Sequence, residues 1–217
     1  MRKLILLGTI AALLVPAASR AEGFQLGLRV GYAPAMGDAA KDLKMNDVGV
    51  KAQIPVQLEA SYKVTPDFAA GVYGSYGLGQ TDSSGFFGAC GASGVSCSSS
   101  TLRVGVQGLY TFNQVKTALV PWLGLGLGWE QAKTKISGGG VTGEFTLDGY
   151  ELALQAGGDY KVSDQFSVGP YIMFSIGQYQ NGKVTNNVDP SFNRSGSIDN
   201  KSTHEWFGFG LAGKFNI

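Results

Sequence analysis

One stretch of this chain alternates apolar residues with glycine, as a strand between two different environments does. From Leu123 to Trp129 the odd positions are apolar, and the even positions between them are glycine. Side chains of a strand point alternately to opposite faces, so one face requires an apolar medium and the other lies against groups that need room. A period of two also excludes a helix.

Similar alternation returns in seven other stretches whose apolar positions end in aromatic residues, and strands of about ten residues cross a bilayer when tilted. These stretches are residues 23–33, 56–63, 68–78, 102–112, 150–161, 166–176 and 206–217. We therefore predict an all-β fold, an eight-stranded antiparallel up-and-down transmembrane β-barrel. Pro170 lacks a backbone N–H, so we expect a bulge or weakened pairing there.

Short and long connections alternate between these stretches, which places all long connections at the same end of the barrel. The short ones are tight turns. The long ones are residues 34–53, the segment that holds the two cysteines, residues 133–149 and residues 178–203. We expect all four to be long loops, of which residues 34–53 are polar, and we expect the glycines at 138–140 to form a flexible loop.

The first residues resemble an export signal. Arg2 and Lys3 precede an apolar run from Leu4 to Val15, and small residues precede Glu22. A transmembrane anchor is the alternative, but the run of 12 residues is shorter than the about 20 that a span requires. We predict that residues 1–21 are a cleaved signal peptide and that residues 22–217 form the barrel domain.

The chain has only 15% charged residues, with 17 basic and 16 acidic side chains and no basic cluster. This pattern argues against nucleic acid as a partner. Cys90 and Cys97 are the two cysteines of an exported chain, which predicts a disulfide between them. His204 is the single histidine, so we expect no metal site and no cofactor.

Two motifs, Pro121–Gly126 and Ala156–Val162, together with the leader and the eight strands, resemble the small bacterial outer-membrane β-barrels of the OmpA, OmpX and OmpW kind. The resemblance covers nearly all of the mature chain. It implies a bacterial outer membrane location, contact with outer-membrane lipid and lipopolysaccharide, and a monomer. Members usually end on an aromatic residue, whereas here Ile217 is last and Phe215 lies two residues before it.

An eight-stranded barrel has an interior just wide enough for side chains or one small ligand. Inward-facing charges should form ion pairs there, because burial of an unpaired charge is costly. The predicted lumen charges are Arg29 with Glu59 at middle depth, Arg103 with Glu130 and Glu151 near the long-loop end, and Asp159 with Lys214 near the short-turn end. The predicted lumen aromatic residues are Trp122 near the short-turn end, Tyr73 and Tyr171 at middle depth, and Trp206 near the long-loop end.

These features predict a structural or surface-interaction role with a lumen plugged by side chains and a surface partner at the long loops. The alternative is a narrow passive conduit or a binding barrel for small solutes, as the OmpW resemblance implies. The upper cluster of Arg103, Glu130 and Glu151 would then be a polar gate or binding site.

An enzyme is the third and most distant reading. Some barrels that this chain resembles modify the acyl chains of lipid A through a histidine and a serine near the outer rim. Ser202 and His204 would share one face of a strand, but the deacylases carry serine two residues after the histidine, where this chain has Trp206. A lone histidine at a loop end is usually solvated. We therefore predict no enzymatic activity.

Overall fold

The computed structural model describes residues 23–81, 88, 90, 92–115 and 117–217. The predicted signal peptide, residues 1–21, lies outside the described residues. The long strands are β1 (Phe24–Ala40), β3 (Ala52–Lys63), β4 (Phe68–Gln80), β5 (Val95–Thr111), β6 (Leu119–Gly138), β7 (Val141–Lys161), β8 (Phe166–Asn186) and β10 (His204–Asn216). The short elements are β2 (Leu43–Lys44), the 3-10 helix η2 (Pro190–Phe192) and β9 (Arg194–Ser197).

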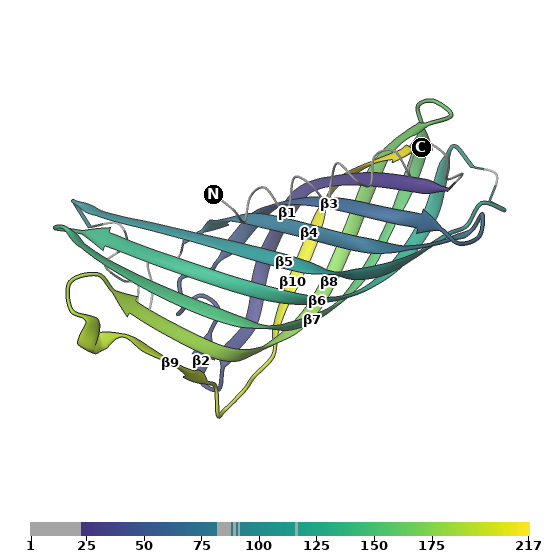
Figure 1. Cartoon of the computed structure of the whole chain (residues 1–217). Helices are drawn as coiled ribbons and strands as arrows, with labels where there is room; N and C mark the ends of the chain where they lie inside the picture. Colours follow the sequence, from purple (N-terminus) through teal and green to yellow (C-terminus); the bar gives the residue numbers. More distant parts are fainter. Residues whose placement is uncertain (1–22, 82–87, 89, 91, 116) are drawn as a thin grey trace, which may run out of the picture.

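The long strands form one antiparallel sheet in the order β10-β1-β3-β4-β5-β6-β7-β8, and β8 pairs with β10 to close it (Figure 1). The predicted eight-stranded up-and-down barrel is therefore confirmed. The start of β1 and the end of β10 meet at the short-turn end, where the Ile217 amide donates to the Phe24 carbonyl at 2.9 Å. The described residues include no helix that is long and apolar enough to span a membrane.

The outer wall of the barrel is apolar, as the alternation requires. Leu125 and Leu127 are 50% and 58% exposed in the absence of lipid. Aromatic rings pair at both rims of this wall, with Tyr32 against Phe209 at one end and Phe24 against Tyr62 at the other. Large apolar side chains in contact with the bilayer, bounded by aromatic belts, are what a membrane-spanning wall presents to lipid.

The prediction of a loop over residues 133–149 is wrong. Strand β6 continues to Gly138, and β7 begins at Val141. Gly139 and Gly140 have φ values of +59° and +81° and form a two-residue hairpin turn that L-residues with side chains rarely adopt. Strand β8 likewise continues to Asn186, well into the predicted loop over residues 178–203.

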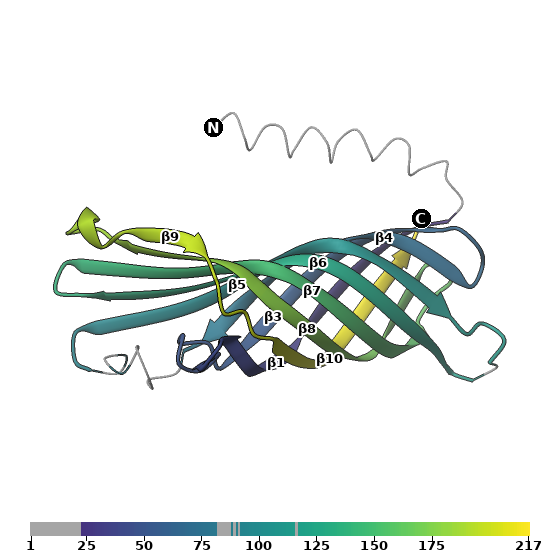
Figure 2. The ribbon, with the colours of Figure 1, turned by 90° about the horizontal axis from the view of Figure 1, so that it is seen from below.

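The extended strands project far beyond the barrel as a sheet, with β9 at its edge (Figure 2). We call this part the extension: the portions of β5 to β8 beyond the directly paired residues Trp129 and Tyr150, together with β9. The disulfide between Cys90 and Cys97 is present, as predicted, and fixes the β4–β5 connection to the β5 strand of the extension.

The polarity of β6 inverts at Trp129. Up to that residue the outward positions are apolar, and the inward positions after Trp122 are glycine. Beyond it the outward residues are Gln131, Lys133, Lys135 and Ser137. The inward residues Ala132 and Thr134 are 3% and 1% exposed, and Ile136 follows them on the same face. Alternation thus continues in the extension with its polar face turned outward.

Strand β7 inverts at the paired residue, Tyr150. Beyond it Asp148 and Glu144 point outward, whereas Leu147 is buried and Phe145 packs beside it. The medium explains the change, because the outer face of the extension meets water and its inner face meets other protein groups. An alternation with its polar residues outward does not match the pattern of a lipid-facing strand, so sequence alone indicates a loop here.

The inner face of the extension packs against a segment that folds into the mouth of the barrel. This segment, residues 41–51, lies between β1 and β3, and we call it the cap. Met45, Val48 and Val50 are at most 2% exposed. The Thr134 hydroxyl donates to the Val48 carbonyl at 2.9 Å. The prediction of a polar surface loop over residues 34–53 is therefore wrong, because strands occupy its two ends and a buried cap occupies its middle.

Pro170 weakens the sheet without a bulge. Between β7 and β8 the pairs Gly157–Tyr171 and Tyr160–Val168 have the same register, and the positions between them are unpaired. The missing N–H of proline explains the interruption. The register shift between these strands lies instead at Asp148 and Gly149, at the base of the extension.

Candidate functional site

Two layers of buried charge fill the barrel, and the lower layer centres on Arg29. This guanidinium forms an ion pair with Glu59, with one hydrogen bond of 3.0 Å, and also donates to the Gln155 side chain. It lies over the rings of Trp122 and Tyr171, 4.8 and 5.4 Å from their centroids. Charge, hydrogen bonds and aromatic faces together compensate for the loss of water around a group that is 2% exposed.

The same layer includes a second ion pair closer to the short turns. The Lys214 ammonium lies 2.7 Å from the Asp159 carboxylate and 4.2 Å from the centroid of the Trp122 ring. The Trp122 indole N–H donates to Asp159 at 2.9 Å. Every charge of the lower layer therefore has a partner of opposite sign.

Glutamines complete the lower layer, and the sequence analysis did not single them out. The Gln107 and Gln57 amides donate to Glu59 at 2.6 and 3.1 Å. Their inward alternation on β5 and β3 was visible, but glutamine carries no formal charge and was not counted as part of the network.

The upper layer centres on Arg103, which lies between two carboxylates. Its Nε atom is 2.9 Å from Glu130 and 3.6 Å from Glu151. The Trp206 ring lies under the guanidinium at 5.0 Å. All three charged side chains are at most 3% exposed. The layer has two acids for one arginine, unlike the lower layer, in which each acid has its own base.

Additional donors gather on Glu130. Its Oε1 atom accepts hydrogen bonds from the Tyr179 hydroxyl at 2.6 Å and the Trp206 indole at 3.2 Å, and the His204 Nε2 atom also lies 3.2 Å away. The sequence analysis missed Tyr179, although it continues the inward series of β8 two residues beyond Gly177. Several hydrogen bonds to one oxygen hold this carboxylate in a fixed position.

The expectation that His204 is solvated is wrong. Its side chain is 1% exposed and stacks on Tyr179 with the ring centroids 4.0 Å apart. It is the first residue of β10, whereas Ser202 precedes the strand. The hydrogen bond at the Nε2 atom runs to Glu130, so the imidazole belongs to the upper layer of the lumen.

Tyr73 lies higher than expected. Sequence alone placed it at middle depth, but its hydroxyl donates to Glu151 at 3.1 Å in the upper layer. Glycine makes room for its ring, since a Cβ atom on Gly105 would lie 2.7 Å from it. Tyr171 stays at middle depth beside Arg29.

The side chains of the two layers interact mainly with one another. Each arginine and lysine is paired with a carboxylate, and aromatic rings lie against these pairs. The described residues contain no group of three or more His, Cys, Asp and Glu side chains that could hold a metal ion. The layers also leave little space, because both span the lumen from wall to wall.

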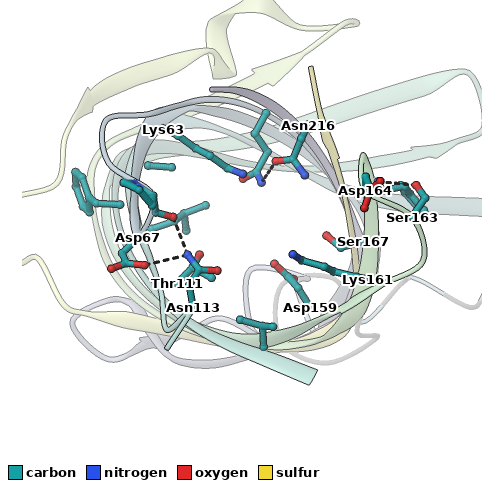
Figure 3. Close-up of a pocket in the computed structure, with 17 residues that line it drawn as sticks. Lys63, Asp67, Thr111, Asn113, Asp159, Lys161, Ser163, Asp164, Ser167 and Asn216 are labelled. Atoms are coloured by element: carbon teal, nitrogen blue, oxygen red, sulfur yellow. Dashed lines mark hydrogen bonds between the residues drawn. The ribbon is translucent and has the colours of Figure 1, made fainter. Parts of the chain in front are cut away.

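A cavity of about 70 Å³ lies below the lower layer, at the short-turn end (Figure 3). The β3–β4 and β7–β8 turns contribute Asp67 and Ser163 to its lining. Lys63 and Lys161 point into it from opposite sides, and the Asp159 side chain lies beside Lys161. It is the one lumen space among the cavities described that polar side chains line.

The outer membrane protein beta-barrel domain family matches residues 4–192, and the chain belongs to this family. Among solved structures, Neisserial surface protein A is 12% identical with a TM-score of 0.55 and covers 90% of this chain and 97% of its own. A major outer membrane protein from Thermus thermophilus is 9% identical with a TM-score of 0.62 and covers 89% of this chain and 99% of its own. At these identities the likeness concerns the fold. No curated protein matches.

The family establishes that this is a bacterial outer membrane β-barrel protein. Barrels of this kind have short periplasmic turns and long extracellular connections. The short-turn cavity therefore faces the periplasm, and the cap and the extension face the cell exterior.

Proposed function

We propose that this protein is a structural and surface-interaction barrel whose lumen does not conduct. The observation that carries the proposal is the stacking of three closures along one axis: the cap, the upper layer and the lower layer. The cap buries Met45, Val48 and Val50, and each layer below holds a buried arginine paired with a carboxylate. A solute would have to displace an apolar segment and then separate two sets of buried ion pairs.

The extension supports the surface-interaction part of the proposal. It raises a polar, mixed-charge face above the lipid, with Lys133 and Glu144 paired at 2.9 Å. Its position beyond the outer aromatic belt exposes it to lipopolysaccharide sugars and to extracellular partners, while the apolar wall below contacts lipid. We propose a monomer without nucleic-acid contact, and we propose no catalytic role for His204.

A narrow conduit is the second candidate, favoured by one observation. Gln53 Nε2 and Ser175 Oγ, and Ser99 Oγ in the extension, are buried without a hydrogen-bond partner among the described residues. Buried polar atoms of this kind are where ordered water binds. A chain of such water would provide a route for small solutes if the layers opened.

Conductance in planar bilayers separates the two candidates. We expect no stable single-channel steps from the wild type, and small transient steps from the double variant Arg29→Ala, Glu59→Ala, because it removes the central ion pair of the lower layer. The matched control is Lys133→Ala, Glu144→Ala, which removes an exposed ion pair and should stay silent. Reproducible steps from the wild type would reject the plugged lumen and favour the conduit.

A further inference from the structure

We propose that the periplasmic cavity binds a small oxyanion, of which orthophosphate is the simplest biological example, between Lys63 and Lys161. The two lysines end strands β3 and β7, which are four places apart in the ring of eight strands and so belong to opposite walls. Figure 3 shows both side chains reaching into the same space. Like charges brought together from opposite walls need a counter-ion between them.

Neither lysine has a carboxylate within ion-pair distance among the described residues. The ion pairs of the described residues include neither Lys63 nor Lys161. Lys63 is also partly buried, whereas Lys161 is exposed at the end of β7. A cationic side chain that is held away from bulk water and has no acidic partner favours an anionic ligand.

Three carboxylates line the cavity, and each is engaged or peripheral. Asp159 is paired with Lys214 at 2.7 Å and accepts from Trp122. Asp67 accepts from the Asn113 amide at 3.0 Å. Asp164 is exposed on the β7–β8 turn, at the rim. The lining therefore holds two lysines that form no ion pair, while Asp159 and Asp67 are bound to other groups and Asp164 lies at the rim.

Neutral donors surround the lysines. The Gln25 amide donates to Asn216 at 3.1 Å, which leaves other amide hydrogens of this pair free to face the cavity, and the Thr111 and Ser167 hydroxyls lie in the same lining. A volume of about 70 Å³ exceeds the about 10–15 Å³ that one water needs and suits a compact anion. Ammonium groups and neutral donors together are the groups that bind oxyanions.

A phosphate could come from solution or from a phospholipid headgroup. The lysines point into the lumen, and the wall around them faces lipid on its other side, so a soluble anion reaches them directly from the periplasm. The two sources can be compared by titration with orthophosphate and with a short-chain phosphatidic acid below its micelle concentration.

The test is isothermal titration calorimetry, in which orthophosphate is added to the folded mature barrel in an uncharged glucoside detergent. We expect saturable binding of orthophosphate, and we expect the double variant Lys63→Met, Lys161→Met to bind about tenfold to hundredfold more weakly, as loss of charged hydrogen bonds predicts. Methionine keeps the apolar stem, and Lys63→Arg should retain binding. The matched control Lys41→Met, Lys44→Met removes two extracellular charges and should bind like the wild type.

Three results would overturn the proposal: no saturable heat with orthophosphate, equal binding by the wild type and the Lys63, Lys161 double variant, or loss of binding in the Lys41, Lys44 control. Binding of phosphatidic acid without binding of orthophosphate would mean that the lysines bind a lipid headgroup. This result would also reject the proposal. Migration of each variant on an unheated gel establishes that the barrel is folded. A conducting wild type would refute the plugged lumen and leave this proposal unaffected.

Discussion

The membrane wall and the extension are two lengths of the same strands with opposite polarity. Below Trp129 and Tyr150 the outward residues are apolar and the lumen holds charge. Above them the outward residues of β6 and β7 are polar, and the inward face is apolar where it packs on the cap. Backbone pairing between β6 and β7 continues through the change without a shift in register.

The comparison shows that an alternating pattern indicates a strand. Which of its two faces is apolar indicates the medium on each side. In the wall, lipid lies outside, and the charges inside must satisfy one another. In the extension, water lies outside, so the inner face can pack as the core of a soluble β-sheet does. The directly paired Trp129 and Tyr150 mark the level of the change.

The largest loss of stability is expected when an acid that is buried in the lumen at the level of Trp129 is removed. Glu130→Ala removes the partner of Arg103 and leaves the donors of Tyr179 and Trp206 unsatisfied. Its cost should be about 3–5 kcal/mol in a urea refolding titration. Glu144→Ala, on the outer face of the extension, should cost about 0–1 kcal/mol because its ion pair is exposed. Equal costs would show that the two acids share one environment.

The next largest loss of stability is expected at one of two positions on the outward face of β6. Leu125→Arg places a charge in lipid and should reduce the free energy of folding into vesicles by about 2–4 kcal/mol. Gln131→Arg lies on the same face two residues beyond Trp129 and should change it by less than about 0.5 kcal/mol. A large loss from Gln131→Arg would place the membrane boundary higher on β6.

The smallest effect concerns the disulfide. Cys90→Ser opens a bridge that connects the β4–β5 segment to the extension, outside the lipid-facing wall. We expect the barrel to keep its heat-resistant migration on gels and the extension to become more sensitive to protease. Loss of heat resistance would mean that the extension contributes to the stability of the wall.

The fold could be predicted from sequence wherever one rule held throughout. Apolar-outward alternation located all eight strands, and Cys90 and Cys97 were correctly paired. The same rule failed above Trp129, where the polarity of Lys133 and Lys135 reads as a loop although its period is still two. The cap was missed because its apolar residues are irregularly spaced, so no period distinguishes a buried segment from an exposed one.

Alternation also predicts which side chains point into the lumen, because Arg29 and Glu130 each lie on the inward side of the alternating pattern of their strand. The depth that the end of a long side chain reaches depends on how far it leans along the barrel, which no sequence pattern specifies. Tyr73 thus joins Glu151 one layer above its expected depth. The place of His204 beside a loop suggests a solvated side chain, whereas its contacts with Tyr179 and Glu130 become visible only in three dimensions.

The central claim, that polarity inverts at Trp129, can be measured on β6 directly. In a variant with both cysteines replaced by serine, nitroxide labels would be introduced one at a time at Leu125, Leu127, Gln131, Lys133 and Lys135 in lipid vesicles. Collision with oxygen should dominate at the first two positions and collision with a water-soluble nickel complex at the other three. Oxygen dominance that persists through Lys135 would mean that the bilayer covers the extension and would contradict the account.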